Sequence, residues 1–302
     1  MPADSVPAPK AWTIGSLITW AADDFRTRGI ENPRLDAEVI VAYALSVTRM
    51  QLIIDSQRPL SADELGMLRE LVKRRRQREP VAYLQGKREF YGRDFKVDAR
   101  VLIPRPDTET LVDVALGRTA DKSLSMRALD LCTGSGCVGI TLAKQRPTSS
   151  VVLSDLSEDA IAVARENAFR LGAYNVTALT GDLFSALTEY QKRAPEALCS
   201  FDLITANPPY IPSAEVETLV PDIRSFEPRL ALDGGVDGLA LVERIVADAR
   251  KYLVKGGVLA MEIGEGEADK TREFMERHGF VDIRKTRDLG RIERVVSGVS
   301  PV

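Results

Sequence analysis

The stretch Asp130-Leu131-Cys132-Thr133-Gly134-Ser135-Gly136-Cys137-Val138-Gly139 decides the fold class. It follows a short apolar run at residues 127–131 and precedes a helical pattern that starts at Cys137. Gly134, Gly136 and Gly139 complete a G-x-G-x-x-G pattern, in which glycines permit a tight turn and a close approach of ligand to backbone. Its position between a strand and a helix is typical of a nucleotide-binding loop.

Strands and helices alternate along the rest of this region. Such alternation favours βαβ units and an α/β, Rossmann-like, doubly wound sheet that is mostly parallel. A short polar loop around Asp288 joins the last two strands, so we expect an antiparallel hairpin at one edge. The seven expected strands are 127–131, 151–154, 176–180, 201–206, 257–263, 280–286 and 292–297, and helices are expected near 107–117, 137–145, 157–171, 237–254 and 267–278.

The N-terminal part of the chain has a helical period instead. Apolar residues recur at three- and four-residue spacing in residues 12–25 and 35–45. Ser61-Ala62-Asp63-Glu64 is typical of a capping box, and Glu79-Pro80 ends the helix that it opens. We expect a helical domain over 1–80, a hairpin or extended linker over 81–103, and the doubly wound domain over 104–302.

Two features near these boundaries have more than one interpretation. The basic run Lys73-Arg74-Arg75-Arg76-Gln77-Arg78 is either a solvated helix end or a docking patch for an RNA-bearing partner. After Pro104-Arg105-Pro106, Asp107 or Thr108 is expected to cap the next helix.

Composition excludes several classes of protein. With 302 residues the chain has room for about two domains, and 41 basic against 44 acidic residues argue against a protein that coats nucleic acid. A single histidine, His278, removes Ser-His-Asp triads and multi-histidine metal sites, and no metal is expected. Cys132, Cys137 and Cys199 lack metal-ligand spacing and are expected to be reduced thiols. No apolar run approaches a membrane span and no secretory signal is present, so we expect a cytoplasmic protein without membrane contact.

Acidic residues at two strand ends indicate a nucleoside ligand. Asp155 ends the second strand, where a carboxylate can accept both hydroxyls of a ribose; the alternative is a helix cap between Ser154 and Ser157. After the third strand, Asp182 suits the amine of an adenine and Leu183 begins an apolar wall. A nicotinamide dinucleotide and S-adenosylmethionine both fit this pattern.

Asn207-Pro208-Pro209-Tyr210 follows the fourth strand, at the edge where open α/β sheets bind ligands. The prolines hold the backbone rigidly. Asn207 Oδ1 and the Pro208 carbonyl can each accept one N–H of a planar NH₂ group, and Tyr210 can pack on its flat face. These residues are therefore the candidate catalytic residues.

Together these motifs resemble the class I S-adenosylmethionine-dependent methyltransferases that act on planar nitrogen. More narrowly, the chain resembles the peptide chain release factor glutamine N5-methyltransferases, the HemK/PrmC family, from about residue 12 to Gly298. Three further stretches carry the match: Glu79-Pro80-Val81-Ala82-Tyr83-Leu84 with Gly86 and Arg88-Glu89-Phe90; Leu102-Ile103-Pro104-Arg105-Pro106-Asp107-Thr108-Glu109; and Phe226-Glu227-Pro228 with Ala231-Leu232, Gly235 and Asp237-Gly238-Leu239.

The resemblance implies transfer of a methyl group from S-adenosylmethionine to a glutamine in the Gly-Gly-Gln loop of a release factor. It also implies that the helical domain helps to dock this protein, with the ribosome as a further expected partner and no sequence-specific nucleic acid. The family often has Asp-Leu-Ala-Gly-Arg near its end, whereas this chain has Asp288-Leu289-Gly290-Arg291, so no role is assigned to that loop. The expected cofactor residues are Asp130, Cys132, Thr133, Gly134, Ser135, Gly136, Asp155, Asp182, Leu183 and Asn207, and the expected substrate residues are Asn207, Pro208, Pro209, Tyr210 and Arg105.

Other functions share parts of this pattern. An adenine N6-methyltransferase of DNA or RNA presents the same planar NH₂, but it would need a basic recognition surface. A glutamine methyltransferase of a ribosomal protein would share the chemistry and differ in docking. A nicotinamide-dependent oxidoreductase would share the glycine loop and leave Asn207 unexplained, and a non-catalytic binding module would use only the basic run.

Overall fold

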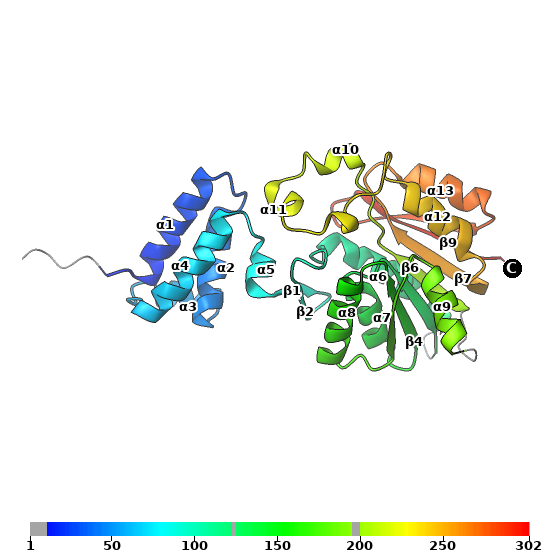
Figure 1. Cartoon of the computed structure of the whole chain (residues 1–302), viewed down its shortest axis with the longest axis horizontal. Helices are drawn as coiled ribbons and strands as arrows, with labels where there is room; N and C mark the ends of the chain where they lie inside the picture. The colour runs from blue at the N-terminus through cyan, green and yellow to red at the C-terminus, as the bar shows by residue number, and fades with distance from the viewer. Residues whose placement is uncertain (1–10, 123–124, 195–199, 302) are drawn as a thin grey trace, which may run out of the picture. The chain divides into compact units, whose positions relative to one another are not determined.

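The computed structural model describes residues 11–122, 125–194 and 200–301. Its contacts divide the chain into two compact units, Met1–Gly86 and Lys87–Val302 (Figure 1). The division falls inside the segment 81–103 that the sequence predicts as a linker. Residues 81–85 form a short helix of the first unit, while the hairpin that follows belongs to the second.

The first unit is helical, and its helices begin at the residues that can cap them. Thr13 accepts a hydrogen bond from Ser16 N, and Ser61 with Glu64 forms the expected capping box. Leu17, Phe25 and Ile40 lie in its buried core. The helices are α1 (Ile14–Thr27), α2 (Pro33–Leu45), α3 (Arg49–Ile54), α4 (Ala62–Arg76) and α5 (Val81–Gln85).

The basic run at the end of α4 is occupied by ion pairs within this unit. Arg74 binds Glu79 at 2.5 Å, and Arg75, which is 4% exposed, binds Asp36 at 2.8 Å. Arg76 lies 2.9 Å from Asp24. These contacts favour the interpretation as a helix end, because three guanidinium groups are already neutralised by neighbouring carboxylates.

The second unit contains the expected seven-stranded sheet, in the order β5-β4-β3-β6-β7-β9-β8. The first five of these strands run parallel, and β9 pairs antiparallel with both β7 and β8, which confirms the edge hairpin. The strands are β3 (Arg127–Leu131), β4 (Ser150–Asp155), β5 (Val176–Thr180), β6 (Phe201–Ala206), β7 (Leu253–Glu262), β8 (Val281–Arg287) and β9 (Glu293–Val299).

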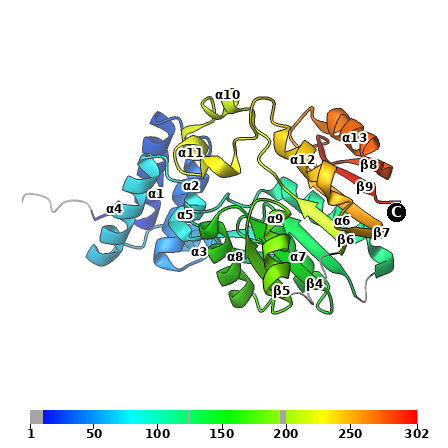
Figure 2. The ribbon, with the colours of Figure 1, turned by 45° about the vertical axis from the view of Figure 1, so that its right-hand side comes forward.

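Helices cover both faces of the sheet (Figures 1 and 2). Alternate strand residues pack in opposite layers. Ala128 packs in one apolar core with α6 (Glu109–Arg118), α7 (Cys137–Gln145) and α8 (Glu158–Arg170). Its neighbour Leu129 packs in the other with α9 (Ser185–Arg193), α12 (Ala240–Ala249) and α13 (Ala268–Arg277). Burial on both faces explains why these strands are continuous apolar runs.

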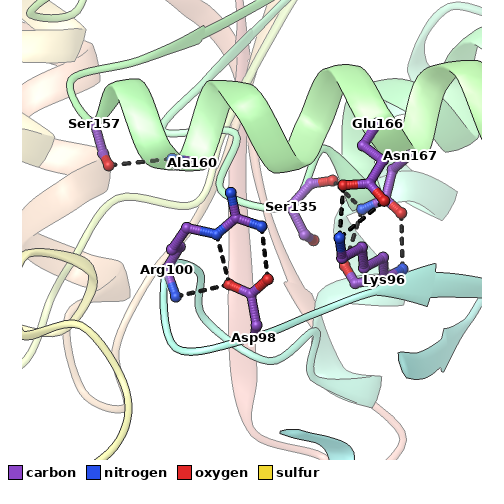
Figure 3. A network of polar contacts seen from close by, with 8 residues as sticks. All are labelled: Lys96, Asp98, Arg100, Ser135, Ser157, Ala160, Glu166 and Asn167. Atoms are coloured by element: carbon purple, nitrogen blue, oxygen red, sulfur yellow. Dashed lines mark hydrogen bonds and ion pairs between the residues drawn. The ribbon is translucent and has the colours of Figure 1, made fainter. Parts of the chain in front are cut away.

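A small hairpin, β1 (Lys87–Phe90) and β2 (Arg93–Lys96), is fixed to α8 by a buried amide. Asn167 accepts from Lys96 N at 2.7 Å, and its Nδ2 donates to the carbonyls of Lys96 and Ser135 (Figure 3). Glu166 adds an ion pair to Lys96. The hairpin therefore belongs to the sheet-containing unit and reaches the glycine loop through Asn167.

The structure differs from the sequence-based expectation mainly in short elements. The helix predicted over 237–254 ends at Ala249, and β7 already begins at Leu253, because a register shift lets Leu253 pair with Phe201 before the main ladder. The helices α3, α5 and α9 and the short α10 (Ser213–Val216) and α11 (Pro221–Arg224) were not predicted. Four of these, α3, α5, α10 and α11, have six residues or fewer and are too short to show a helical period.

Candidate functional site

The site lies where the order of the strands reverses, between β3 and β6. The last residues of the two strands, Leu131 and Ala206, are paired, and Ala206 is also paired with Met261 of β7. Cys132 and Asn207, which follow β3 and β6, therefore lie at the same edge of the sheet as Glu262, the last residue of β7. This switch point is where open α/β sheets bind ligands.

The three glycines of the loop after β3 serve different purposes. Gly134 has φ +54° and its missing side chain would meet nothing within 4 Å, so its backbone faces open space. Gly136 has φ +82°, and a Cβ there would lie 2.6 Å from Ile140. A Cβ on Gly139 would lie 2.1 Å from Leu153, so this glycine lets α7 approach the sheet.

Asp130 is fully buried, and its carboxylate accepts hydrogen bonds from two residues of the glycine loop. Its Oδ2 accepts from Thr133 Oγ1 at 2.5 Å and from Gly139 N at 3.1 Å, and its Oδ1 accepts from Thr205 at 2.8 Å. Burial raises the pKa of Asp130 to about 6, and these hydrogen bonds oppose the shift. The carboxylate ties the loop to α7 and to β6.

Asp155 ends β4, as the sequence predicts, and its carboxylate contacts the glycine loop. Oδ2 accepts from Gly134 N at 2.8 Å, and Oδ1 accepts from Ser157 N at 2.9 Å. Burial raises the pKa of Asp155. Both interpretations therefore have a basis, because the carboxylate caps the start of α8 and each oxygen retains a lone pair for a ribose hydroxyl.

A first pocket opens above the loop. All the residues expected to bind the cofactor line this pocket except Gly136. The N–H of Gly136 instead donates to the Thr133 carbonyl within the turn. Arg100 also lines this pocket and is held by Asp98 through two hydrogen bonds of 2.8 and 2.7 Å (Figure 3). The sequence analysis missed this pair, because it lies in the segment predicted as a linker.

The residues after β5 form one wall of the first pocket. Leu183 is buried and its backbone has φ +49°. The carboxylate of Asp182 forms an ion pair of 2.7 Å with Arg244 of α12. Any contact of Asp182 with an adenine amine would therefore be shared with this guanidinium.

A second pocket meets the first at Asn207. Both are lined by Leu102, Arg105, Asn207 and Ala231, while Pro208 and Tyr210 line the second and Pro209 the first. The Arg105 guanidinium, predicted to contact substrate, binds Glu227 at 2.5 Å. Glu227, which is 5% exposed, also accepts from Ile103 N, so it joins the segment 102–109 to the segment 226–239.

A glycine-rich turn braces the Asn207–Tyr210 segment. A Cβ on Gly234 would lie 2.7 Å from the Pro209 carbonyl oxygen, and one on Gly238 would lie 2.3 Å from the Tyr210 carbonyl oxygen. Ile211 donates to Leu232 O at 3.0 Å and accepts from Gly234 N at 2.8 Å. The backbones are in direct contact, which only glycine permits.

Two buried polar residues beside Asn207 were not predicted as part of the site. The Thr108 hydroxyl does not cap α6, contrary to expectation, and instead accepts from Asn207 Nδ2 at 3.3 Å. Glu262 Oε1 accepts from the Tyr210 hydroxyl at 3.4 Å. Burial raises the pKa of Glu262 to about 7 and also raises that of Tyr210. A lone carboxylate at the end of an apolar strand is the signal that could have identified Glu262.

Two of the cysteines line the first pocket, whereas the histidine lies outside both pockets. Burial raises the pKa of Cys137 to about 12 and that of Cys132 as well, so both thiols stay protonated at neutral pH; Cys199 lies outside the described residues. His278 ends α13 and lines neither pocket. Within the described ranges, no cluster of three or more His, Cys, Asp or Glu could hold a metal, and no helix has the length and apolarity to cross a membrane.

Comparisons with known proteins agree with this geometry. A family model described as PrmC N-terminal domain matches residues 16–86, and one described as Methyltransferase domain matches 122–278. The release factor glutamine methyltransferase of Geobacter sulfurreducens is 43% identical over 96% of this chain and 98% of its own length. The chain belongs to the release factor glutamine methyltransferase family. The relative from Chlorobaculum tepidum is 38% identical over 97% of this chain and 99% of its own.

A solved structure shows the same fold at lower identity. A methyltransferase from Pyrococcus furiosus superimposes with a TM-score of 0.51 and 17% identity, over 70% of this chain and 91% of its own. This similarity concerns the fold alone.

The first pocket fits S-adenosylmethionine, the cofactor of this methyltransferase family. The Gly134 backbone offers an approach without a side chain, and the Asp155 carboxylate has free lone pairs for hydroxyl groups. Leu156 and Leu183 add apolar surface for a purine. These residues would hold the nucleoside part, with Asn207 at the far end of the pocket.

Proposed function

We propose that this chain transfers a methyl group from S-adenosylmethionine to the side-chain nitrogen, N5, of a glutamine in the Gly-Gly-Gln loop of a peptide chain release factor. One observation carries the proposal: Asn207 lines both pockets, so a carboxamide bound beside it in the second would face a methyl donor bound in the first. Membership of the family supports the same substrate.

The chemistry requires geometry more than acid–base groups. The glutamine nitrogen is a weak nucleophile, because its lone pair is delocalised into the carbonyl. S-adenosylmethionine, when bound, supplies a methyl group on a sulfonium sulfur that becomes neutral on transfer. Alignment of nitrogen, methyl carbon and sulfur can contribute up to about 7–11 kcal/mol.

The Asn207–Tyr210 segment would orient the nucleophile. Asn207 Oδ1 and the Pro208 carbonyl each accept one N–H of the glutamine amide, while Tyr210 packs on its plane. These acceptors stabilise positive charge as it develops on the nitrogen. The nitrogen gives up one proton after the N–C bond forms, and solvent can accept that proton.

The first unit is the proposed docking site for the release factor. Residues 1–86 would dock the release factor, in the cytoplasm and in the vicinity of ribosomes, and no sequence-specific nucleic acid is involved. The match of residues 16–86 to a domain model of this family supports the docking role.

The test uses the purified full chain, labelled S-adenosylmethionine and a purified release factor, followed by mass mapping of the modified residue. We expect one methyl group on the glutamine of the Gly-Gly-Gln loop. Asn207→Ala should lower kcat by about 100-fold or more while cofactor affinity changes by less than about threefold. Methylation of adenine in nucleic acid instead, or near-normal turnover by the variant, would contradict the proposal.

A further inference from the structure

Asn207 can perform its proposed role only if its amide oxygen, and not its nitrogen, faces the second pocket. An amide has an accepting end and a donating end, and the two are distinguished by their hydrogen-bond partners. Asn207 Nδ2 lies 3.3 Å from Thr108 Oγ1. If this contact were reversed, the NH₂ group would face the NH₂ group of a glutamine, and two donors would repel.

The Thr108 hydroxyl has one proton, and a carboxylate competes for it. Thr108 is 2% exposed and Glu262 is 2% exposed, so water does not satisfy either of them. Glu262 Oε2 has no hydrogen bond at normal distance within the part of the chain that is described. The Thr108 hydroxyl lowers the pKa of Glu262, as a nearby donor does, against the larger opposite effect of burial.

Charged groups around Glu262 influence its pKa, and therefore whether its carboxyl group is ionised and accepts hydrogen bonds. The Arg294 guanidinium of β9 lowers the pKa of Glu262, and the Asp107 carboxylate raises it. Arg294 is itself placed by Asp288 at 3.2 Å and by Asp107 at 3.8 Å. The Tyr210 hydroxyl also lies beside Glu262 and donates to its Oε1. Above its pKa of about 7, Glu262 is ionised and accepts hydrogen bonds only, so both neighbouring hydroxyls then point their protons toward it.

We propose that Thr108 and Glu262 are positioning residues that fix the Asn207 amide with Oδ1 toward the substrate. The observed contact is the one in which Asn207 Nδ2 donates to Thr108 Oγ1. In the proposed arrangement Thr108 turns its proton to the buried Oε2 of Glu262, which no other described group reaches. Because Thr108 gives its only proton to the carboxylate, its oxygen can meet only the NH₂ end of Asn207. This inference rests on the proposed function, in which Asn207 Oδ1 accepts an N–H of glutamine.

The first variant removes the hydroxyl without changing the shape of the side chain. Thr108→Val in the full chain should lower kcat for release factor methylation by about tenfold or more, with KM and the affinity for S-adenosylhomocysteine changed by less than about threefold. Thr108→Ser, which keeps the hydroxyl, should restore at least about half of the wild-type kcat. The matched control is Thr271→Val, since Thr271 is fully buried on α13 and its hydroxyl has no partner among the described residues.

The second variant reverses the polarity at the carboxylate. Glu262→Gln can donate to Thr108, which frees the hydroxyl to donate to Asn207 and turns the amide. We expect a kcat loss comparable to that of Thr108→Val, with a melting temperature no lower than that of the wild type. Wild-type kcat in Thr108→Val or Glu262→Gln would overturn the positioning role, and so would equal losses in Thr108→Ser and Thr108→Val. Absence of methyl transfer by the wild type would instead reject the proposed function.

Discussion

At the scale of single residues, the site depends on carboxylates, buried at Asp130 and Glu262 and half-buried at Asp155, that hold backbone and side chains in place. Asp130 and Asp155 both accept from backbone N–H groups of the glycine loop. Glu262 interacts with side chains that surround Asn207. Each of the three has a pKa raised by burial, which shows that the fold tolerates a desolvated acid where the site needs an acceptor.

Asp155→Asn should weaken cofactor binding. The replacement puts an NH₂ group where one oxygen now accepts from Gly134 N or Ser157 N, and it removes the charge that a ribose would meet. We expect a loss of about 1–3 kcal/mol in S-adenosylmethionine affinity, measured by calorimetry. Asp159→Asn, on the exposed side of α8, should bind normally. Unchanged affinity of the Asp155 variant would remove Asp155 from the cofactor site.

Glu262→Gln should be more stable than the wild type above neutral pH. The folded-state pKa of Glu262, about 7, lies above its ordinary value of 4.5, so the native state binds the proton more tightly than the unfolded state. Stability from this group is complete below pH 4.5 and is lost as the pH rises through about 7. The loss amounts to about 3 kcal/mol at most, and the variant should lack it. Urea unfolding at pH 5.5 and pH 8 measures the difference; the same pH dependence in both proteins would contradict this prediction.

At the scale of elements, the segment after β6 is rigid because another loop packs on its backbone. Gly234 and Gly238 approach the carbonyls of Pro209 and Tyr210 more closely than a Cβ would allow. Arg105, which also lines the second pocket, is held by an ion pair with Glu227. The family-specific stretches therefore form the walls that keep the Asn207 segment in one conformation.

Gly238→Ala should reduce both stability and kcat. At φ +78° any side chain is strained, and here the Cβ would also lie 2.3 Å from the Tyr210 carbonyl oxygen. Gly256→Ala is the matched control, because φ is +73° and nothing lies within 4 Å. We expect the control to lose about 1–2 kcal/mol with normal turnover, and Gly238→Ala to lose more and to turn over slowly. Chemical unfolding and steady-state kinetics measure both effects, and normal turnover in Gly238→Ala would show that the Asn207 segment does not depend on this packing.

At the scale of the whole molecule, the pocket for the cofactor and the helices that we propose to dock the release factor belong to different units. Every residue that lines the first pocket lies in the second unit, whereas the ion pairs of the basic run lie in the first. The hairpin β1–β2 connects to the glycine loop through Asn167, so the second unit starts at this hairpin.

A chain limited to residues 87–302 should bind S-adenosylmethionine with an affinity within about threefold of the full chain. If residues 1–86 dock the release factor, the short chain should also lose much more turnover on the whole factor than on a peptide that carries the Gly-Gly-Gln loop. Calorimetry and methylation assays on both substrates measure these effects. If the short chain loses turnover equally on the whole release factor and on the peptide, residues 1–86 do not dock the factor.

The sheet and the order of motifs on it could be predicted from the residue pattern, because buried parallel strands are apolar runs and glycine loops follow them at fixed positions. The pattern also identified Asn207 and Asp155 at strand ends. Strand ends are local features, so no knowledge of distant contacts was needed for either.

Only the tertiary structure decided the partners of these residues. Arg105 meets Glu227, and Thr108 meets Asn207 rather than capping its helix, because the chain folds back from positions far apart in sequence. The same holds for Glu262, whose place beside Asn207 follows from the pairing of β6 with β7. A side chain has a typical role in sequence, but its hydrogen bonds depend on which groups the packed core brings within about 3 Å.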